Sequence, residues 1–461
     1  MSMFWSMPYS THARSCAATD SSGVDPEMAT PSSTTDSTGG FLSRRRDWSA
    51  NNVVGFMMKQ AVDHPECISL AAGLVDPQTL PIEATSRAVE RMMGDPTLAR
   101  AGLQYETTEG AQRLRDLLLE YLAGLEGVTA DTVGLKIDRD QLVLSTGSQQ
   151  MLALLCEATL DPGDICLIAD PTYYVMLGTV NGQGARAVPI ESDADGMRID
   201  SLERTLDALD AEGQLQRVKM IYVVSDFDNP RSVSLATDRR RRLVEIVTEL
   251  SGQQRILIVE DAAYRELYYD GVSRPSVWSF DEEGETVALV QTFSKCFSPG
   301  LRVGFGILPR DLVGPVLDLK GNQDFGSTSF SQHLLATVLE DGLFASHVDH
   351  LRDAYVVKRD ALTEAAAVHL GDVEGVEWLV PDGGLYVWLT VPEHVDAGFD
   401  GALFNRAVQQ EQVMYVPGDL CHIGVDGVRP RNQLRLSFGV ENSERLADGM
   451  ARLARAIRAE L

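Results

Sequence analysis

Between residues 100 and 310, short apolar runs alternate with helix-like stretches, and this alternation limits the possible folds more than any other feature. Amphipathic stretches such as residues 149–160 and 236–252 lie between some of the runs. Near-continuous apolar strands that alternate with helices are typical of a sheet covered on both faces. We therefore predict an α/β fold with a mainly parallel seven-stranded sheet. Its seven strands are QLVLS, ICLIAD, ARAVPI, VKMIYVVS, ILIVED, TVALVQ and VGFGIL.

The pattern changes after residue 330. A long helical stretch is followed by three short strands, VEWLV, GLYVWLTV and QLRLSFG, which indicate a smaller α+β domain at the C-terminus. Residues 10–40 are dense in Ser, Thr, Ala, Asp and Gly and are expected to be disordered. The predicted division is a disordered tail (1–44), an N-terminal arm with part of the small domain (45–98), a large cofactor-binding domain (99–335) and the small C-terminal domain (336–461).

Composition excludes several classes of partner. The net charge of −27 argues against binding to nucleic acid or to an anionic membrane. No apolar run has the length of a membrane span, and the first 22 residues lack the pattern of a secretory signal. The six cysteines are scattered without a CxxC pair, so we expect reduced thiols, a cytoplasmic location and no metal site. The run of four arginines at 239–242 is expected to form the solvated face of a helix start.

Polar residues follow five of the predicted strands. In open α/β sheets, ligands bind beyond the carboxyl ends of the strands. Taken singly, each residue has an ordinary explanation, since Gly-Ser and Asn-Pro form turns, Asp caps helices, and Lys295 can be a loop lysine that reaches solvent. Together they form one chemically consistent set. Its members are Ser148 and Gln149, Tyr173, Asn229, Asp261 with Tyr264, and Thr292 with Ser294 and Lys295, with Arg302 seven residues further on.

This set suits a ligand that has a phosphate, a flat aromatic ring and an electrophilic carbonyl. Lys295 can form an imine with the carbonyl, and Asp261 can hold a protonated ring nitrogen. Such a ligand is pyridoxal 5′-phosphate. The remaining contacts that the set offers are to the phosphate (Ser148, Gln149, Ser294, Arg302), to the face of the ring (Tyr173) and to a ring oxygen (Asn229, Tyr264).

Further motifs occur in a consistent order from residue 71 to residue 438. They are AAGLVDPQTLP, LQYETTEGAQRLR, STGSQQ, DPTYY, DNP, EDAAYREL, TFSKCFSPGLRVG, VPDGGLYVWL, VPG and LRLSF. With them, the chain from about residue 48 to its end resembles the fold-type I, pyridoxal-phosphate-dependent aminotransferases of class I/II. It looks closest to the branch that holds the 2-aminoadipate, kynurenine and aromatic or branched-chain aminotransferases.

The resemblance implies a role for each matching residue. Lys295, Asp261 and Tyr264 would be catalytic, and Thr292 would be a further phosphate contact. Arg435 would bind the substrate carboxylate, with Gly73 and Asn229 beside the substrate. Tyr105 would reach the phosphate of the neighbouring subunit, so a homodimer with shared active sites is expected. The alternatives are that Tyr105 packs within its own subunit and that Arg435 is a surface cation on an edge strand.

Two stretches depart from the family pattern. Asn229-Pro230 is followed by Arg231-Ser232 where Thr-Gly is usual, and Gly73-Leu74 is followed by Val75 where Pro is usual. The first change is expected to reshape the turn beside the cofactor, and the second to alter the loop on the substrate side.

The predicted function is transfer of an amino group by a ping-pong mechanism. The donor would be an L-amino acid of the 2-aminoadipate, aromatic or branched-chain type, and the acceptor a 2-oxo acid such as 2-oxoglutarate. The alternative is a pyridoxal-phosphate-dependent lyase or decarboxylase, because fold does not fix the reaction. A third hypothesis is the effector domain of a transcriptional regulator, against which the low-complexity start and the acidic charge argue.

Overall fold

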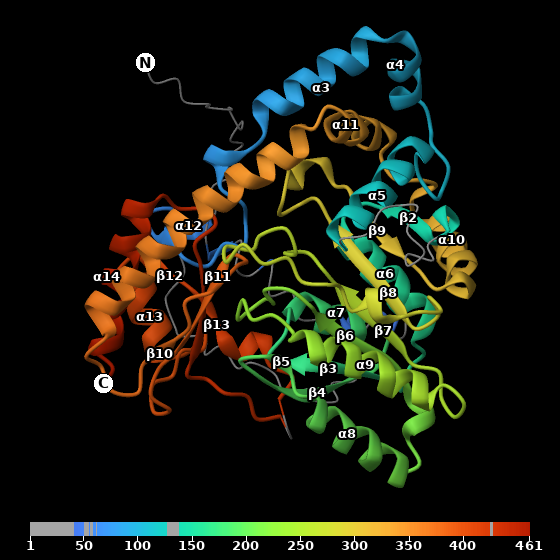
Figure 1. Ribbon diagram of the computed structural model, residues 1–461. Helices are drawn as coiled ribbons and strands as arrows, with labels where there is room; N and C mark the ends of the chain where they lie inside the picture. The colour runs from blue at the N-terminus through green and yellow to red at the C-terminus, as the bar shows by residue number, and fades with distance from the viewer. Residues whose placement is uncertain (1–40, 50–54, 56–58, 61, 127–137, 425–426) are drawn as a thin grey trace. The chain divides into compact units, whose positions relative to one another are not determined.

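An eight-stranded sheet forms the centre of the fold, with strand order β2-β9-β8-β7-β6-β3-β4-β5 (Figure 1). Strands β8, β7, β6, β3 and β4 are parallel, whereas β9 runs antiparallel to β2 and β8. Seven of these strands are the predicted ones, so the predicted fold class is confirmed. The eighth, β5, adds only two residues at the edge. The bounds are β2 (Leu142–Ser145), β3 (Ile165–Asp170), β4 (Arg186–Asp193), β5 (Gly196–Met197), β6 (Val218–Val224), β7 (Leu257–Asp261), β8 (Val287–Thr292) and β9 (Gly304–Ile307).

The structure is a computed structural model that describes residues 41–49, 55, 59–60, 62–126, 138–424 and 427–461. Most of the predicted disordered tail therefore lies outside the described residues. Residues Arg44–Leu461 form one compact unit. The predicted limits of the domains at residues 98 and 335 remain a prediction.

The sheet is apolar on both faces because alternate residues of its inner strands β3, β6, β7 and β8 enter different clusters of the core. On β3, Ile165 and Leu167 pack with side chains of α5, α8, α9 and α11, whereas Cys166 and Ile168 pack with those of α6, α7 and α10. This accounts for the near-continuous apolar runs in the sequence. The bounds of these helices are α5 (Gln112–Leu125), α6 (Ser148–Thr159), α7 (Tyr174–Asn181), α8 (Ile199–Ala211), α9 (Thr237–Leu250), α10 (Arg310–Asp324) and α11 (Ser329–Glu340).

Helix α9 corrects one expectation about the run of four arginines. Arg240 is not solvated: it is 0% exposed, and its guanidinium pairs with Asp226 at 2.7 Å. It also donates to the carbonyl oxygens of Ser225 and Leu235. Arg240 therefore ties the helix to the turn after β6, the turn that carries Asn229.

A second sheet, of four strands, belongs to the C-terminal part of the chain, with order β10-β11-β14-β13 and antiparallel pairing throughout. Its strands are β10 (Glu377–Trp378), β11 (Tyr386–Thr390), β13 (Val416–Pro417) and β14 (Gln433–Ser437). The 28-residue helix α12 (Leu343–Leu370) packs against α14 (Ser443–Arg458), and both lie beside this sheet in Figure 1.

An early segment joins this C-terminal part. Strand β1 (Ile68–Ser69) pairs in parallel with β12 (Val413–Met414), and Ile68 and Leu70 enter the same apolar cluster as the second sheet. Further helices among the described residues are α1 (Arg45–Trp48), α3 (Ile82–Gly94), α4 (Pro96–Leu103) and α13 (Ala402–Gln409). Short 3-10 turns are η1 (Pro77–Thr79), η2 (Arg139–Gln141), η3 (Leu215–Arg217), η4 (Trp278–Phe280), η5 (Pro299–Leu301) and η6 (Gly418–Cys421). Within the described parts of the chain, no helix has the length and apolar character needed to cross a bilayer.

Candidate active site

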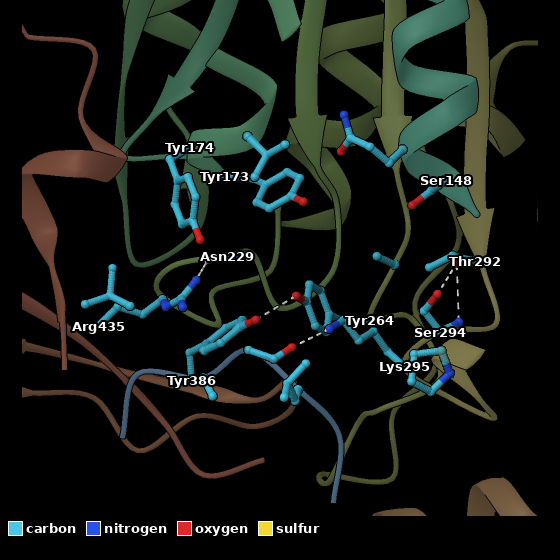
Figure 2. Close-up of a pocket in the computed structure, with 18 of the residues that line it drawn as sticks. Ser148, Tyr173, Tyr174, Asn229, Tyr264, Thr292, Ser294, Lys295, Tyr386 and Arg435 are labelled. Carbon is cyan, nitrogen blue, oxygen red and sulfur yellow. Dashed lines mark hydrogen bonds between the residues drawn. The ribbon is translucent and has the colours of Figure 1, made fainter. Parts of the chain in front are cut away.

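A cavity of about 370 Å³ lies at the carboxyl ends of β6, β7 and β8, and residues of β14 and of the segment after β1 complete its walls. Strand ends and the second sheet thus face each other across one space (Figure 2). Twelve of the thirteen predicted site residues line it: Gly73, Ser148, Gln149, Tyr173, Asn229, Asp261, Tyr264, Thr292, Ser294, Lys295, Arg302 and Arg435.

One end of the cavity offers donors for an anion. Helix α6 begins at Ser148, after Gly147 in a left-handed conformation (φ 74°). Arg302 donates to the carbonyl oxygen of Thr146 at 3.2 Å and to Ser294 Oγ at 3.3 Å. A Cβ at residue 147 would lie 2.7 Å from the Arg302 guanidinium, so glycine is required for this approach. A helix start and a guanidinium converge here, as a phosphate requires.

Two further predicted residues, Thr292 and Gln149, complete this end. Thr292 Oγ1 lies 3.0 Å from Ser294 Oγ, and it accepts a bond from the Ser294 backbone at 3.3 Å (Figure 2). Gln149 donates from its amide nitrogen to Thr179 Oγ1 at 3.0 Å, and its buried Oε1 has no hydrogen-bond partner among the described residues.

Asp261 occupies the floor of the cavity, at the last position of β7, and is only 4% exposed. Burial raises the pKa of its carboxyl to about 6, although hydrogen bonds from Tyr222 (2.9 Å) and the Ala263 backbone (3.2 Å) act in the other direction. In the described part of the chain, no cation pairs with this carboxylate. A buried carboxyl in this position can therefore be stabilised by a cationic ligand atom.

Lys295 lies just past β8, and its Nζ donates to the carbonyl oxygen of Gly73 at 2.7 Å (Figure 2). It forms no ion pair with a carboxylate of the described residues, and the same is true of Arg302 and Arg435. The side-chain nitrogen therefore lines the cavity without a carboxylate partner among the described residues. Such an amine is available for chemistry at a carbonyl.

Arg435 is not a surface cation, because its side chain is 3% exposed on the central strand β14. Its Nη1 donates to Asn229 Oδ1 at 2.9 Å and its Nη2 to the carbonyl oxygen of Ala71 at 3.0 Å. The ring of Tyr386 lies 4.4 Å from the guanidinium carbon. A buried cation whose partners are all neutral is costly unless an anion binds beside it. This arrangement fits the carboxylate of a substrate.

The turn that departs from the family pattern keeps a left-handed residue. Ser232 takes φ 56°, and its hydroxyl accepts a bond from the Tyr386 backbone at 3.2 Å. Arg231 pairs with Asp228 at 3.1 Å. The serine therefore adopts the conformation usual for glycine and adds a link to β11, which carries Tyr386.

Tyr105 is the one predicted residue outside the cavity. It is 82% exposed, and its ring lies 5.9 Å from that of Phe325.

The sequence did not predict Tyr386 and Tyr174, which line the cavity beside Arg435. Both belong to motifs of the family resemblance, VPDGGLYVWL and DPTYY, and the second aromatic of DPTYY is the signal that points to Tyr174.

Comparisons with known proteins agree with this geometry. Residues 65–453 match the family described as aminotransferase class I and II. The chain belongs to this family. The aromatic-amino-acid aminotransferase 1 of Thermococcus litoralis is 32% identical over 400 residues, which cover 87% of this chain and 90% of the relative.

Two solved aminotransferase structures are similar to the whole described fold. A multiple substrate aminotransferase from Thermococcus profundus has a TM-score of 0.82 at 32% identity, covering 92% of this chain and 99% of that one. A kynurenine aminotransferase from Pyrococcus horikoshii, solved in complex with PMP, has a TM-score of 0.82 at 31% identity, covering 91% and 98%. The chain is thus a pyridoxal-phosphate-dependent aminotransferase, as predicted, and the lyase and regulator hypotheses are not favoured.

The residues present fit pyridoxal 5′-phosphate. The carboxyl of Asp261, unpaired and buried, suits a protonated ring nitrogen. The helix start at Ser148 together with Arg302 suits a phosphate, and the unpaired amine of Lys295 suits a carbonyl. Each chemical feature of the cofactor thus has a matching group on the walls of one cavity.

Proposed function

We propose that the preferred amino donors are aromatic or branched-chain L-amino acids, with 2-aminoadipate as the alternative. The acceptor would be a 2-oxo acid such as 2-oxoglutarate. The substrate side of the cavity supports an apolar side chain, because Leu74, Val175, Met414 and Val416 line it. Apart from Lys295, Arg302 and Arg435, the described lining contains no cation that could pair with a side-chain carboxylate.

The observation that carries the proposal is the position of Arg435, a buried cation without a carboxylate partner in the same cavity as Lys295 and Asp261. We propose that Arg435 binds the substrate carboxylate through its fork of donors. This contact would fix Cα, so that the proton to be removed points toward Lys295 Nζ.

Proton transfer is the proposed task of Lys295. When bound, pyridoxal phosphate supplies a carbonyl for the amine and a ring that withdraws electrons from Cα. Lys295 Nζ would take the proton from Cα of the donor and later return one to the new amino acid, acting as base and then as acid. Asp261 would hold a proton on the ring nitrogen, and burial from water would strengthen that interaction.

Two groups would donate to the ring oxygen of the cofactor. Asn229 accepts a bond from Arg435 at its Oδ1, which leaves its Nδ2 group as the donor. Tyr264 is the second donor through its hydroxyl. Tyr173 would stack on the ring, while Ser148, Gln149, Thr292, Ser294 and Arg302 would hold the phosphate.

We also propose that the active unit is a two-fold homodimer in which Tyr105 reaches the phosphate of the neighbouring subunit. The side chain is exposed and lies outside the cavity of its own chain. Leu103 and Phe325, near it, are also exposed apolar side chains, a grouping that a second subunit would cover. A cytoplasmic location remains a prediction from the scattered cysteines.

The test of the donor class is a kinetic panel with 2-oxoglutarate as acceptor. We expect kcat/KM for phenylalanine, tyrosine or leucine to exceed that for aspartate by at least about tenfold, because each charged group buried without a partner costs more than 1.4 kcal/mol. Preference for aspartate or glutamate as donors over all apolar amino acids would refute the proposed donor class. Absence of amino transfer to any 2-oxo acid would refute the wider proposal.

A further inference from the structure

Tyr386 occupies a central place in the cavity wall that the roles above do not use. It begins β11, is 1% exposed and places its hydroxyl 3.1 Å from that of Tyr264 (Figure 2). The two rings meet edge to face, with centroids 5.9 Å apart. On its other side, the Tyr386 ring lies 4.4 Å from the Arg435 guanidinium carbon. One side chain thus contacts both the proposed cofactor donor and the proposed carboxylate anchor.

The surrounding chain is shaped around the Tyr386 hydroxyl. A Cβ at residue 73 would lie 2.8 Å from this oxygen, closer than a carbon and an oxygen can approach, so Gly73 makes room for it. The carbonyl of Gly73 also accepts the bond from Lys295 Nζ. The backbone of Tyr386 is fixed by a separate hydrogen bond, in which its N–H donates to Ser232 Oγ at 3.2 Å.

We propose that Tyr386 is a positioning residue that orients the hydroxyl of Tyr264 toward the cofactor and holds the Arg435 guanidinium in place for the substrate carboxylate. The inference rests on the roles proposed above for Tyr264 and Arg435. A hydroxyl carries a single proton. If Tyr264 donates its proton to the ring oxygen, the proton in the bond between the two tyrosines must come from Tyr386. The directions of both hydrogen bonds, from Tyr386 to Tyr264 and from Tyr264 to the ring oxygen, are then fixed, and each bond polarises the other.

Electrostatics favour Tyr386 as the donor of this pair. Although burial raises the pKa of its hydroxyl, the positive charges of Arg435 and Lys295 act in the other direction, and the pKa is lowered overall. A more acidic hydroxyl is a stronger hydrogen-bond donor. The titratable groups that interact electrostatically with it come from several elements: Tyr264 after β7, Lys295 after β8, Cys421 in η6, Arg435 on β14, Tyr173 and Tyr174 at α7, and Tyr355 on α12.

The test uses the holoenzyme of three variants. Tyr386→Phe removes only the hydroxyl, and Tyr386→Leu also removes the ring. The control, Tyr415→Phe, removes another buried hydroxyl of the same apolar cluster, one that donates to the Ala397 carbonyl at 3.0 Å and does not line the cavity. The readouts are the pH midpoint of the bound cofactor's visible absorbance change and the separate values of kcat and KM.

The Phe variant should raise the pH midpoint by roughly 0.3–1 unit. A weaker donor at Tyr264 leaves more negative charge on the ring oxygen, so the proton whose loss changes the absorbance is held more tightly. Its KM for the amino donor should change less than about threefold, since the ring still lies on Arg435. The Leu variant should raise the midpoint and also raise KM by about 5–30-fold, the range for a desolvated cation–π contact. Tyr415→Phe should change neither value.

A double-mutant cycle with Gly73→Ala gives an independent readout. In the wild type, the added methyl group meets the Tyr386 hydroxyl, so kcat/KM should fall by at least about tenfold. In the Tyr386→Phe background, the nearest remaining atoms, Tyr386 Cζ and Arg435 Nη2, lie 3.8 Å from that position. The loss should there shrink to less than about threefold.

An unchanged pH midpoint in Tyr386→Phe together with additive effects of the two substitutions would overturn the inference. A midpoint shift of the same size in Tyr415→Phe would also overturn it, since the effect would then be general. Failure of the proposed function is a separate outcome, because it would appear as absent transamination in the wild-type enzyme. If the wild type transaminates but the pH midpoint is unchanged in Tyr386→Phe and the two substitutions are additive, only the proposed role of Tyr386 is contradicted.

Discussion

The buried carboxyl of Asp261 leads to a prediction with opposite signs in the protein without and with cofactor. Replacing Asp261 by Asn removes the charge but keeps an oxygen that can accept the bond from Tyr222. In the apoprotein, this change should stabilise the fold at alkaline pH. In the holoenzyme, the same change should lower kcat by several orders of magnitude, because the ring nitrogen would lose the anionic partner proposed above.

The magnitude follows from the difference between the folded and unfolded pKa values of Asp261. Burial raises the folded value to about 6, whereas an unfolded chain has about 3.9. A raised folded pKa gives stability that is fully present below the unfolded value and is lost as the pH rises through the folded one. The ionised carboxylate therefore destabilises the apoprotein by about 3 kcal/mol at pH 8 and by about 1.5 kcal/mol at pH 5.

Urea unfolding of the apoproteins measures this effect. Asp261→Asn should exceed the wild type by about 2 kcal/mol or more at pH 8, and the gain should shrink by about 1.5 kcal/mol at pH 5. The control is Asp207→Asn, which removes the same charge from an exposed position of α8 and should shift stability equally little at both pH values. A gain that does not depend on pH, or a loss at pH 8, would refute the argument from desolvation. A fall in kcat of less than tenfold would identify another partner for the ring nitrogen.

Three further predictions concern other residues of the site. Lys295→Ala should abolish nearly all turnover while the cofactor still binds through its phosphate contacts, as equilibrium dialysis would show; near-normal transamination would contradict the assignment. Mixed dimers of Lys295→Ala subunits with subunits that carry an inactivating change at Tyr105 should regain part of the activity, since one site of each hybrid is intact; hybrids that form but stay inactive would exclude a shared site. Ser232→Gly should change the free energy of unfolding by less than about 1 kcal/mol, because relief of left-handed strain offsets the lost bond to Tyr386, whereas Ser232→Ala keeps the strain and should cost about 1–2 kcal/mol. Equal stabilities of the two variants would show that residue 232 is not strained.

The strand ends could be predicted from the sequence because the topology places them together. Parallel strands end at one edge of the sheet, so the residue after each apolar run belongs to a common site whatever the details of packing. This rule alone is enough to predict that Asp261 and Lys295 belong to the site. The resemblance to a family added Gly73 and Arg435, which lie outside the large sheet and which no strand-end argument reaches.

The contacts of Tyr386 could not be predicted in this way. Its hydroxyl meets that of Tyr264 across 122 residues of sequence, and its backbone meets Ser232 across 154. These contacts depend on how the second sheet approaches the ends of the first, and no local pattern encodes that approach. In sequence, Tyr386 is one residue of the motif VPDGGLYVWL, and the motif does not reveal which side chains its hydroxyl meets.

The burial of Arg240 was predicted wrongly for a different reason, because the sequence does contain a pattern that indicates it. Arg240, Leu243, Val244 and Val247 follow the spacing of one helix face, and all four are buried. Composition predicts a solvated face for four consecutive arginines, whereas the helical period assigns one of them to the core. Asp226, in the turn after β6, is the ion-pair partner that offsets the cost of burying this guanidinium.

The charge of the cavity is opposite to that of the chain as a whole. The chain has a net charge of −27, which repels the anions that the enzyme must bind. Beyond roughly 8 Å, salt at physiological strength screens most of this repulsion. At short range, the cavity offers Lys295, Arg302 and Arg435 against the single carboxylate Asp261. Because these cations have no carboxylate partners among the described residues, the anions that enter do not have to displace an existing ion pair. Affinity for a phosphate and for a carboxylate is thus a local property of the walls, and the acidic surface can vary without changing it.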